Sequence, residues 1–346
     1  MENSYTFSEI QSQGNTLEKT FVLLKNQTFQ ASESYVFTGC GTSFYLAHSA
    51  AKYFQALTGI TSQAAPSSEL FLYPENFIPI DKKVKVIAIS RSGTTSEAVE
   101  AVKSVKDREN VDILAVTCND HSPLLEWSSE KIVLSHVQEK SVVMTSSFTN
   151  MLYALQLYAA NIAESIDETA QLKAAAEEMK NVVKSTSAIK SLAENLELKR
   201  FIFLGCGVYQ GAAKESCLKL KEMTQTICES YSTLEFRHGP ISITDEKTAI
   251  IIMGSEKTKD LDAALLYDVK KHGAYTVLIS DCIIKADSAI DLFIPLHTET
   301  KAPNQLVLYL PFLQMLAYYR ALALSLNPDE PRHLSQVVKL PSIGIH

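Results

Sequence analysis

The feature that most constrains the fold is a series of short apolar runs, each followed by a helical pattern. In the first half these runs are Ser34–Thr38, Lys83–Ile89, Asp112–Thr117 and the weaker Lys131–Leu134. Runs that are short, β-branched and nearly all apolar are typical of strands buried on both faces of a parallel sheet. Helical spacing over Phe44–Leu57 and Thr95–Val105 separates them. We therefore predict an open α/β fold, which is a mainly parallel sheet flanked by helices in a Rossmann-like three-layer sandwich.

The same alternation returns in the second half of the chain. Its strand-like runs are Arg200–Leu204, Thr248–Met253, Ala274–Ile279 and Asp291–Leu296. Its helical runs are Gln210–Cys228, Leu261–His272 and Leu306–Leu326. Between the halves, Met151–Leu196 is a long stretch rich in Ala, Lys and Glu, which predicts the last helix of the first half and a connecting helix.

A Gly-Cys-Gly turn occupies the same place in each half. It occurs in Phe37–Ser43 (FTGCGTS) and again in Phe203–Tyr209 (FLGCGVY), where each time it closes the first strand and opens a helix. A motif that recurs at one structural position indicates internal duplication. We therefore expect two similar α/β domains.

Composition excludes several classes of protein. A chain of 346 residues with 46% hydrophobic and 21% charged residues is ordinary for two globular domains. The net charge of −7 argues against a nucleic-acid partner, which requires clustered Lys and Arg.

The scattered cysteines form no CxxC pair and are expected to be reduced. The first residues lack a signal-peptide pattern, and the longest apolar helix, expected around Met151–Ile162, is too short for a bilayer. We therefore expect a cytoplasmic protein without a membrane partner.

The run SRSGTTS, Ser90–Ser96, follows a predicted strand and precedes a predicted helix. Ligands of open α/β sheets bind at this end of the strands. Hydroxyl groups and unpaired helix N–H groups together hold a phosphate well, and the Arg91 guanidinium could add charge. The run is not a Walker loop, because no Gly-Lys-Ser/Thr follows. Helix capping explains one or two of its hydroxyl groups but not all of them.

Two further clusters have weaker functional signals. Gly39–Ser43 (GCGTS) and Met144–Thr149 (MTSSFT) both lie where a strand gives way to a helix. Tight turns and capping hydroxyl groups explain these patterns as well as ligand binding does.

Two titratable residues follow in the second half. On the helix that starts at Gln210, the apolar stripe includes Cys217 and Leu220, whereas Glu222 lies on the opposite face. Periodicity alone therefore predicts a solvated carboxylate. His238 precedes Gly-Pro, which fixes a turn, although a loop histidine is more often structural than catalytic.

Taken together, the motifs resemble the sugar isomerase (SIS) domain family, as two tandem domains. Within that family the chain is similar to the isomerase half of glucosamine-6-phosphate synthase and to the amino-sugar-6-phosphate deaminases and isomerases. The matching runs are Gly39–Ser43, Ile89–Thr95, Lys219–Glu222, Arg237–Pro240 and Pro331–Val338, and Gly207–Ser216 with Met144–Thr149 resembles the galactosamine/tagatose-6-phosphate branch. The resemblance implies a helical segment over 1–30, domains over 31–165 and 197–330 joined by a helix over 166–196, and a tail over 331–346 that contributes to the active site.

The resemblance also implies roles for individual residues. Glu222 would move a proton between C1 and C2, His238 would assist ring opening from the neighbouring subunit of a homodimer, and Lys219 would lie near the sugar hydroxyls. No metal or other cofactor is implied. The expected substrate- and phosphate-binding residues are Gly41, Thr42, Ser43, Ser90, Arg91, Ser92, Thr95, Val142 and Gln336.

Three departures from the synthase pattern bear on the chemistry. The synthase has a glutaminase domain with an N-terminal cysteine nucleophile, whereas this chain begins Met-Glu-Asn, so we expect it not to use glutamine. Gln336 stands at the place of a lysine in the synthase tail, and the nearest lysine is Lys339. Arg91 replaces a glutamine of the synthase phosphate loop.

The leading hypothesis is therefore an enzyme that isomerises a 6-phosphorylated amino sugar and releases ammonia or an amine. A fructosamine-6-phosphate deglycase runs similar chemistry from the ketose side and stays open. A sugar-phosphate sensor without catalysis also stays open, although no helix-turn-helix or basic arm precedes Phe37. A dinucleotide-binding oxidoreductase does not fit, because Phe44 occupies the place of the third glycine of GxGxxG.

Overall fold

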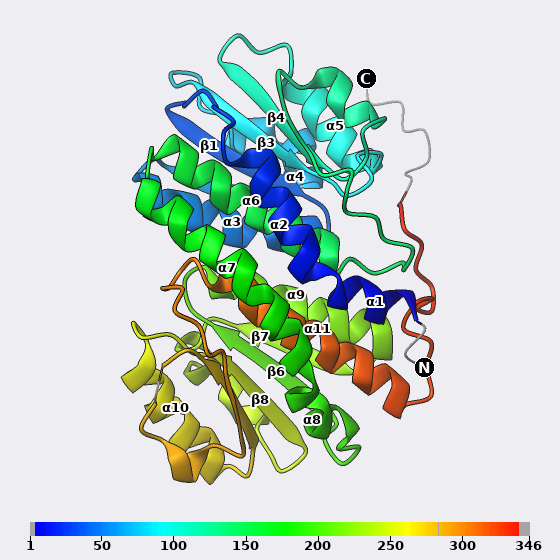
Figure 1. The fold of residues 1–346 in the computed structure, drawn as a ribbon, viewed down its shortest axis with the longest axis vertical. Coiled ribbons are helices and arrows are strands. Elements are labelled where there is room, and N and C mark those ends of the chain that lie inside the picture. Colours follow the sequence, from blue (N-terminus) through cyan, green and yellow to red (C-terminus); the bar gives the residue numbers. More distant parts are fainter. Residues whose placement is uncertain (1–3, 283, 339–346) are drawn as a thin grey trace. The chain divides into compact units, whose positions relative to one another are not determined.

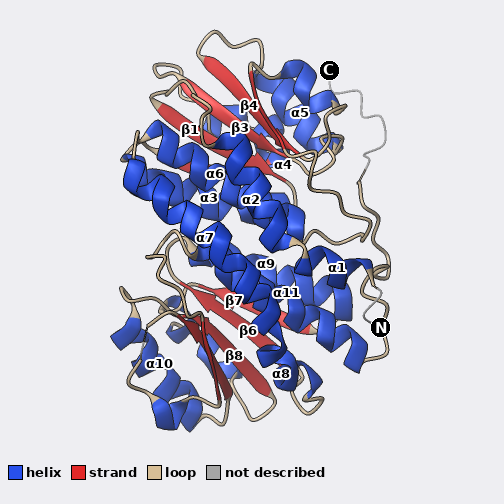
Figure 2. Ribbon diagram, in the orientation of Figure 1, coloured by secondary structure: helices blue, strands red, loops and turns tan. Residues whose placement is uncertain are grey.

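The apolar runs form two parallel sheets in the computed structural model, which describes residues 4–282 and 284–338 (Figure 1). The sheets belong to two units. The amino-terminal unit is Thr16–Ala170 together with Ser335–His346, and the carboxy-terminal unit is Gln171–Leu334 together with Met1–Asn15. Helices flank the sheet of each unit, as Figure 2 shows by colour. The prediction of tandem α/β domains is confirmed, whereas their exact boundaries stay a prediction.

The amino-terminal unit holds a five-stranded sheet of order β2-β1-β3-β4-β5, in which every neighbouring pair is parallel. Its strands are β1 (Ser34–Gly39), β2 (Ser62–Pro66), β3 (Val84–Ile89), β4 (Val111–Thr117) and β5 (Glu130–Val133). The helices in this part of the chain are α2 (Gln13–Leu24), α3 (Thr42–Thr58), α4 (Ser67–Leu72), α5 (Ser96–Val105) and α6 (Ser146–Ile162).

The carboxy-terminal unit holds a second five-stranded parallel sheet, of order β10-β9-β8-β6-β7. Its strands are β6 (Arg200–Gly205), β7 (Ile227–Tyr231), β8 (Thr248–Met253), β9 (Tyr275–Ser280) and β10 (Leu292–Pro295). The remaining helices are α1 (Tyr5–Gln11), α7 (Ile166–Ser185), α8 (Lys190–Glu194), α9 (Tyr209–Thr224), α10 (Lys259–Lys271) and α11 (Leu306–Ala323).

The two sheets have one topology. In each, the first strand pairs with the second on one side and with the third on the other, and the fourth and fifth strands follow outward. The Gly-Cys-Gly turns also correspond in detail. A Cβ atom on Gly39 would lie 2.6 Å from the Ser43 carbonyl carbon, and one on Gly205 would lie 2.7 Å from the Tyr209 oxygen. Both turns therefore require glycine where the first helical turn packs against the strand end, which supports internal duplication.

The central strands explain why their sequences are continuous apolar runs. Every residue of β1, β3 and β8 is buried. Helices cover both faces of a parallel sheet, so alternation with polar residues is lost. One apolar core surrounds Val86 and Val102 in the amino-terminal unit, and another surrounds Ile250 and Leu265 in the carboxy-terminal unit.

Two sequence expectations about elements are wrong. The helix expected over Gln210–Cys228 ends at Thr224, because Gln225 takes a left-handed φ of 53° and the next residues form β7. Ile227, which falls within the range expected for that helix, instead begins β7 and is 71% exposed. The edge strand β2 was missed because its sequence, Ser62–Pro66 (SQAAP), has no β-branched residue.

The longest strongly apolar helix is α11 rather than the one around Met151–Ile162. Among the residues described, α11 alone is long and apolar enough to cross a membrane. However, 83% of this segment is buried inside the structure. Its composition is therefore that of a core helix.

Asp262 provides a test of the carboxy-terminal core. Its side chain is buried near the start of α10 and accepts a hydrogen bond from Thr258 Oγ1 at 2.6 Å. Burial outweighs this hydrogen bond and raises the pKa of Asp262 from 3.8 to about 6. The folded state therefore binds this proton more tightly than the unfolded state, and the stability that the proton contributes is lost as the pH rises from about 4 to about 6.

We predict that Asp262→Asn removes this dependence. In urea unfolding, the free energy of unfolding of the variant should gain on wild type between pH 4 and pH 7, by up to about 3 kcal/mol. Asp260→Asn, at an exposed site on the same helix, should keep the wild-type pH dependence. A constant difference between Asp262→Asn and wild type across this range would contradict the assignment.

Candidate active site

The predicted phosphate loop lies at the point where the strand order of the amino-terminal sheet reverses. β1 leads outward to β2 on one side, whereas β3 leads to β4 and β5 on the other. Gly39–Ser43 follows β1 and Ser90–Thr95 follows β3, so both runs end adjacent parallel strands at the same edge. Open α/β sheets bind ligands outside the carboxyl ends of their strands at such a switch point.

Hydrogen bonds within the loop fix its hydroxyl groups. Ser90 Oγ accepts from the Gly93 N–H at 3.1 Å and lies 3.2 Å from Thr95 Oγ1. Ser92 Oγ accepts from the Thr94 N–H at 3.2 Å and from Thr94 Oγ1 at 3.0 Å. Gly93 has a φ of 63°, and a Cβ atom there would lie 2.2 Å from Ser122 Cβ. The loop therefore has one shape that only glycine permits.

Capping does not account for these hydroxyl groups. Thr95 is the N-cap of α5, yet no side-chain cap bond forms there. The same holds at the start of α3, where Gly41 is the N-cap and the following Thr42 and Ser43 are buried. Helix starts without side-chain caps are suited to an anion, which accepts from the first N–H groups and interacts favourably with the helix dipole.

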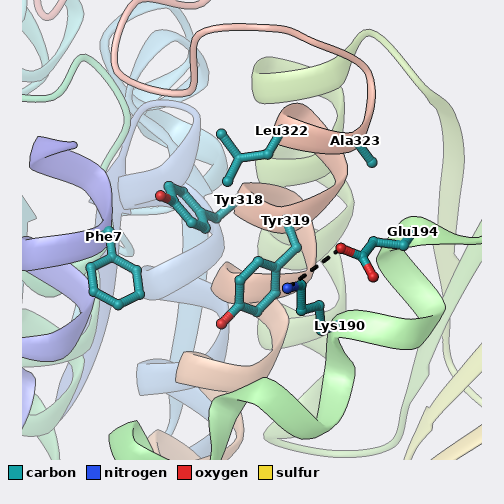
Figure 3. Close-up of a pocket in the computed structure, with 7 residues that line it drawn as sticks. All are labelled: Phe7, Lys190, Glu194, Tyr318, Tyr319, Leu322 and Ala323. Atoms are coloured by element: carbon teal, nitrogen blue, oxygen red, sulfur yellow. Dashed lines mark ion pairs between the residues drawn. The ribbon is translucent and has the colours of Figure 1, made fainter. Parts of the chain in front are cut away.

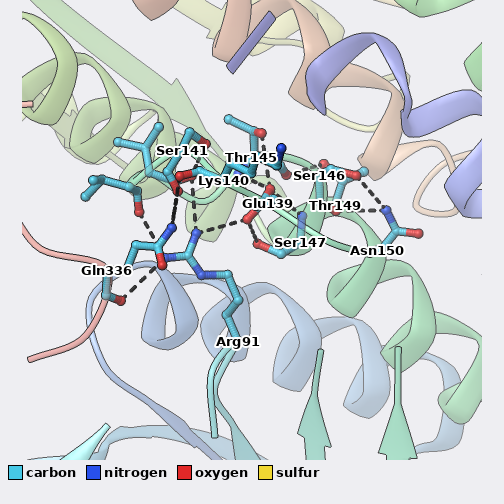
Figure 4. Close-up of polar contacts among 12 residues, drawn as sticks. Arg91, Glu139, Lys140, Ser141, Thr145, Ser146, Ser147, Thr149, Asn150 and Gln336 are labelled. Carbon is cyan, nitrogen blue, oxygen red and sulfur yellow. Dashed lines mark hydrogen bonds and ion pairs between the residues drawn. The ribbon is translucent and has the colours of Figure 1, made fainter. Parts of the chain in front are cut away.

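Arg91 lies in the same loop, but its guanidinium contacts protein groups. Nη1 donates to Glu139 Oε2 at 3.0 Å (Figure 4). Nη2 donates to the Val142 carbonyl at 2.9 Å. Nη2 also lies 3.4 Å from the Gln336 carbonyl oxygen. Val142 and Gln336, two of the expected binding residues, thus lie beside Arg91, whereas Glu139 was missed. Lys339 lies outside the described residues.

In the carboxy-terminal unit, α9 brings the predicted residues Lys219 and Glu222 together with Glu215, which was missed. The Lys219 side chain is 1% exposed, and its Nζ lies 3.4 Å from Glu215 Oε1 and in direct contact with Glu222 Oε2. Glu215 was overlooked, although its i−4 spacing from Lys219 is a usable signal. Burial by itself lowers the pKa of Lys219, but the attraction of Glu215 and then of Glu222 outweighs it, so the pKa is raised.

The environment of Glu222 differs from the one that periodicity predicts. Its side chain is only 19% exposed, so it is not a solvated helix charge. The helix carries apolar residues on one face and the Glu215–Lys219–Glu222 cluster on another, both largely buried. Periodicity failed here because it assumes that the second face meets water.

His238 lies on a surface loop after β7. It is exposed, and its N–H donates to the Glu235 carbonyl at 3.0 Å, which fixes the backbone. The preceding Arg237 pairs with Asp268 at 2.8 Å, and Gly239 has a φ of 118°. Within the described part of the chain, the His238 imidazole makes no hydrogen bond or ion pair. The backbone at His238 is thus fixed, and its imidazole is exposed.

The pocket in Figure 3 contains none of the predicted site residues. It has a volume of about 460 Å³ and is lined by residues of α1, α8 and α11 of the carboxy-terminal unit. Tyr319 stands beside Lys190, whose Nζ lies 5.8 Å from the ring centre and 3.6 Å from Glu194 Oε1. Among the residues described, no group of three or more His, Cys, Asp or Glu side chains could hold a metal ion.

Two α/β units, each built on a five-stranded sheet of parallel strands, define the class of fold. The chain belongs to the SIS domain family, whose pattern matches residues 28–161 and again residues 196–324. The comparisons therefore confirm the family that the motifs indicated.

Curated relatives and solved structures agree with this assignment. The chain is 32% identical to glutamine–fructose-6-phosphate aminotransferase (isomerizing) from Buchnera aphidicola, over 86% of this chain and 50% of that protein. It is 29% identical to D-galactosamine-6-phosphate deaminase AgaS from a Shewanella species, over 87% of this chain and 78% of that protein. The structure of glucosamine-6-phosphate deaminase from Thermotoga maritima matches with a TM-score of 0.81 and 27% identity, over 97% of this chain and 100% of that one. The chain spans about half the length of the aminotransferase relatives that it matches.

The buried cluster on α9 gives a direct test. We predict that Lys219→Met lowers the free energy of unfolding by about 3–5 kcal/mol, because it leaves two carboxylates without their ammonium partner. Adding Glu215→Gln should recover part of the loss. Urea unfolding at pH 7 measures both effects. Lys271→Met is the control, because Lys271 is 76% exposed and lies 3.9 Å from Asp268. An effect of Lys219→Met as small as that of the control would show that the cluster is not a coupled buried unit.

Proposed function

We propose that this chain is a phosphosugar isomerase and deaminase that acts on a 6-phosphorylated amino sugar and releases ammonia or an amine. The observation that carries the proposal is the contact between Glu222 and the buried Lys219. It holds a carboxylate in a fixed place on α9, as a base that moves a proton must be held. The deaminases among the relatives and the hydroxyl-rich loop after β3 support the class of substrate.

The proposed reaction begins with binding of the phosphate group. Ser90, Ser92 and Thr95 offer hydroxyl groups, and the start of α5 offers backbone N–H groups. His238 then assists ring opening by moving a proton between the ring oxygen and the C1 hydroxyl, which yields the open-chain aldehyde. The phosphate contacts hold the sugar in place through both steps.

Proton transfer by Glu222 follows. Its carboxylate removes the C2 proton while the C1 carbonyl oxygen takes up a proton from water, which gives an enolamine with a hydroxyl group at C1. The Glu222 carboxyl then returns its proton to C1, and the nitrogen releases a proton to water, which leaves an imine at C2. Water adds to the imine, ammonia leaves, and a ketose phosphate remains. Lys219 has two roles in this scheme, because it orients the Glu222 carboxylate and lies near the sugar hydroxyls.

Gln336 in the place of the synthase lysine favours release of an amine from the sugar over transfer of an amine to the sugar. The Gln336 side chain donates to the Lys140 and Ser141 carbonyls at 3.0 and 3.1 Å. An amide in these contacts cannot form the covalent imine that a lysine amine forms with a carbonyl. The same observation is compatible with a fructosamine-6-phosphate deglycase, so the substrate panel below includes that class.

The test is a panel of 6-phosphorylated amino sugars and fructosamines, with separate assays for ammonia, free amino acid and ketose phosphate. We expect ammonia and ketose phosphate in equal amounts from an amino-sugar 6-phosphate, and none from the unphosphorylated sugar. Free amino acid from a fructosamine phosphate would favour the deglycase. Tight binding of sugar phosphates without any product would identify a sensor and contradict the proposal.

Glu222→Gln keeps the size and hydrogen bonding of the side chain but removes the base. We predict that kcat falls by about 10²–10⁴-fold while KM barely changes. Ser92→Ala is the matched binding variant, and it should mainly raise KM, because contacts equal in ground and transition states affect KM alone. Full activity in Glu222→Gln would contradict the proposed chemistry.

We also propose a homodimer in which His238 serves the partner's site. The exposed imidazole and the family resemblance motivate this. Sedimentation should show a dimer. A mixture of inactive Glu222→Gln and His238→Ala chains should recover about a quarter of wild-type activity after subunit exchange. This follows because about half of the dimers are then mixed, and one of the two sites in each mixed dimer is intact. Recovery is not expected if His238 acts within its own chain, and a fully active monomer would contradict the dimer.

A further inference from the structure

Glu139 is the most completely bonded carboxylate near the phosphate loop. Its side chain is 0% exposed. Oε1 accepts from the Thr145 N–H at 2.9 Å, from Thr145 Oγ1 at 3.2 Å and from the Ser147 N–H at 2.8 Å. Oε2 accepts from Arg91 Nη1 at 3.0 Å and from Ser147 Oγ. A buried charge is stable only when it is paired and bonded in this way.

These contacts give Glu139 two functions in the fold. α6 begins at Ser146, and its N-cap residue Thr145 makes no side-chain cap bond. Glu139 instead accepts the N–H of Ser147 in the first turn, where a negative charge interacts favourably with the helix dipole. The same carboxylate orients the Arg91 guanidinium, so the start of α6 and the phosphate loop share one anchor.

Arg91 extends the network to the tail. Its Nη atoms donate to the carbonyls of Val142 at 2.9 Å, Val143 at 3.4 Å and Gln336 at 3.4 Å. The Gln336 side chain in turn donates to the Lys140 and Ser141 carbonyls (Figure 4). The tail is thus tied to the segment after Glu139 both directly and through an arginine of the phosphate loop.

We propose that Glu139 and Arg91 are a positioning pair that couples phosphate binding in the Ser90–Thr95 loop to docking of the tail through Gln336. This rests on the phosphate-binding part of the proposed function. Arg91 then acts through the loop and the tail, with its charge taken up by Glu139. Because coupling between two binding events is reciprocal, phosphate should tighten tail docking and the docked tail should tighten phosphate binding.

The consequence concerns residue 336, which stands where the synthase branch has its lysine. If docking follows phosphate binding, a phosphorylated substrate fixes the tail before its chemistry starts. Arg91 and Glu139 would therefore help to select phosphorylated sugars without contacting the sugar. A direct role of Arg91 as a phosphate ligand predicts a different result in the experiment below.

The experiment measures binding of inorganic phosphate by calorimetry and hydrogen exchange of the peptide that contains Ser335 and Gln336. The variants are Arg91→Gln, Glu139→Gln, the double variant Arg91→Gln/Glu139→Gln, and Gln336→Ala. Arg200→Gln is the control, because Arg200 also joins a carboxylate, Asp245, to a backbone carbonyl, that of Ile243, but in the other unit. Thermal unfolding of every variant separates loss of stability from loss of coupling.

In wild type, phosphate should slow exchange of the tail peptide. Each single variant at 91 or 139 should abolish this slowing and weaken phosphate binding about tenfold, within the usual range of coupling energies. The double variant should bind phosphate about as weakly as either single variant, because the two residues act through one route and their losses do not add. Gln336→Ala should weaken phosphate binding to a similar extent when it is the only change. When it is added to Arg91→Gln, it should weaken phosphate binding no further. Arg200→Gln should change neither readout.

Three results would overturn the proposal. Weaker phosphate binding in Arg91→Gln with normal affinity in Gln336→Ala would show that Arg91 binds phosphate directly. A lower unfolding temperature with intact tail protection would show that the pair is only structural. If wild type does not bind phosphate, both the phosphate site and its coupling to the tail are ruled out. Product formation in the substrate panel tests the catalytic part of the proposed function separately.

Discussion

The central parallel strands of both units are buried on both faces, and this burial determines where polar groups can lie. A strand such as β3 has no solvent-facing side, so its polar residues can lie only at its ends. Each crossover returns through a helix, which places every strand-to-helix loop at the same edge of the sheet. The hydroxyl-rich loop after β3 and the Gly-Cys-Gly turn after β1 therefore lie together because of the sheet topology. Their separation in the sequence is irrelevant to this.

Buried ion pairs organise the candidate site in each unit. In the amino-terminal unit, Glu139 and Arg91 fix the turn before α6 and the loop after β3. In the carboxy-terminal unit, Lys219 lies between Glu215 and Glu222 on one helix. Such pairs add little net stability compared with apolar packing, but removing one partner is costly. They are therefore suited to hold groups in position, which is what catalysis by proton transfer requires.

The fold could be predicted from the sequence because its signal is local. Runs such as Lys83–Ile89 are unambiguous, and the repeated Gly-Cys-Gly turn revealed the duplication. The errors occurred where context decides: SQAAP becomes a strand through pairing with β1, and Ile227 leaves the helix because Gln225 adopts a left-handed conformation. Glu215 and Glu139 were missed for a related reason. Sequence alone predicts that a carboxylate in a polar run is exposed to solvent, because its buried partners are not visible in the sequence pattern. For Glu139 these partners include Arg91, which lies far away in the sequence.

The proposed function depends on proton transfer by Glu222 between C1 and C2 of a phosphorylated amino sugar. The most direct measurement is nuclear magnetic resonance of the turnover in heavy water, with the substrate that the panel identifies. Wild type should introduce solvent deuterium at C1 of the ketose product or at C2 of recovered substrate, and Glu222→Gln should do so at least about 10²-fold more slowly. Rapid incorporation by Glu222→Gln, or turnover in wild type with no deuterium at either carbon even at long reaction times, would show that Glu222 does not transfer this proton.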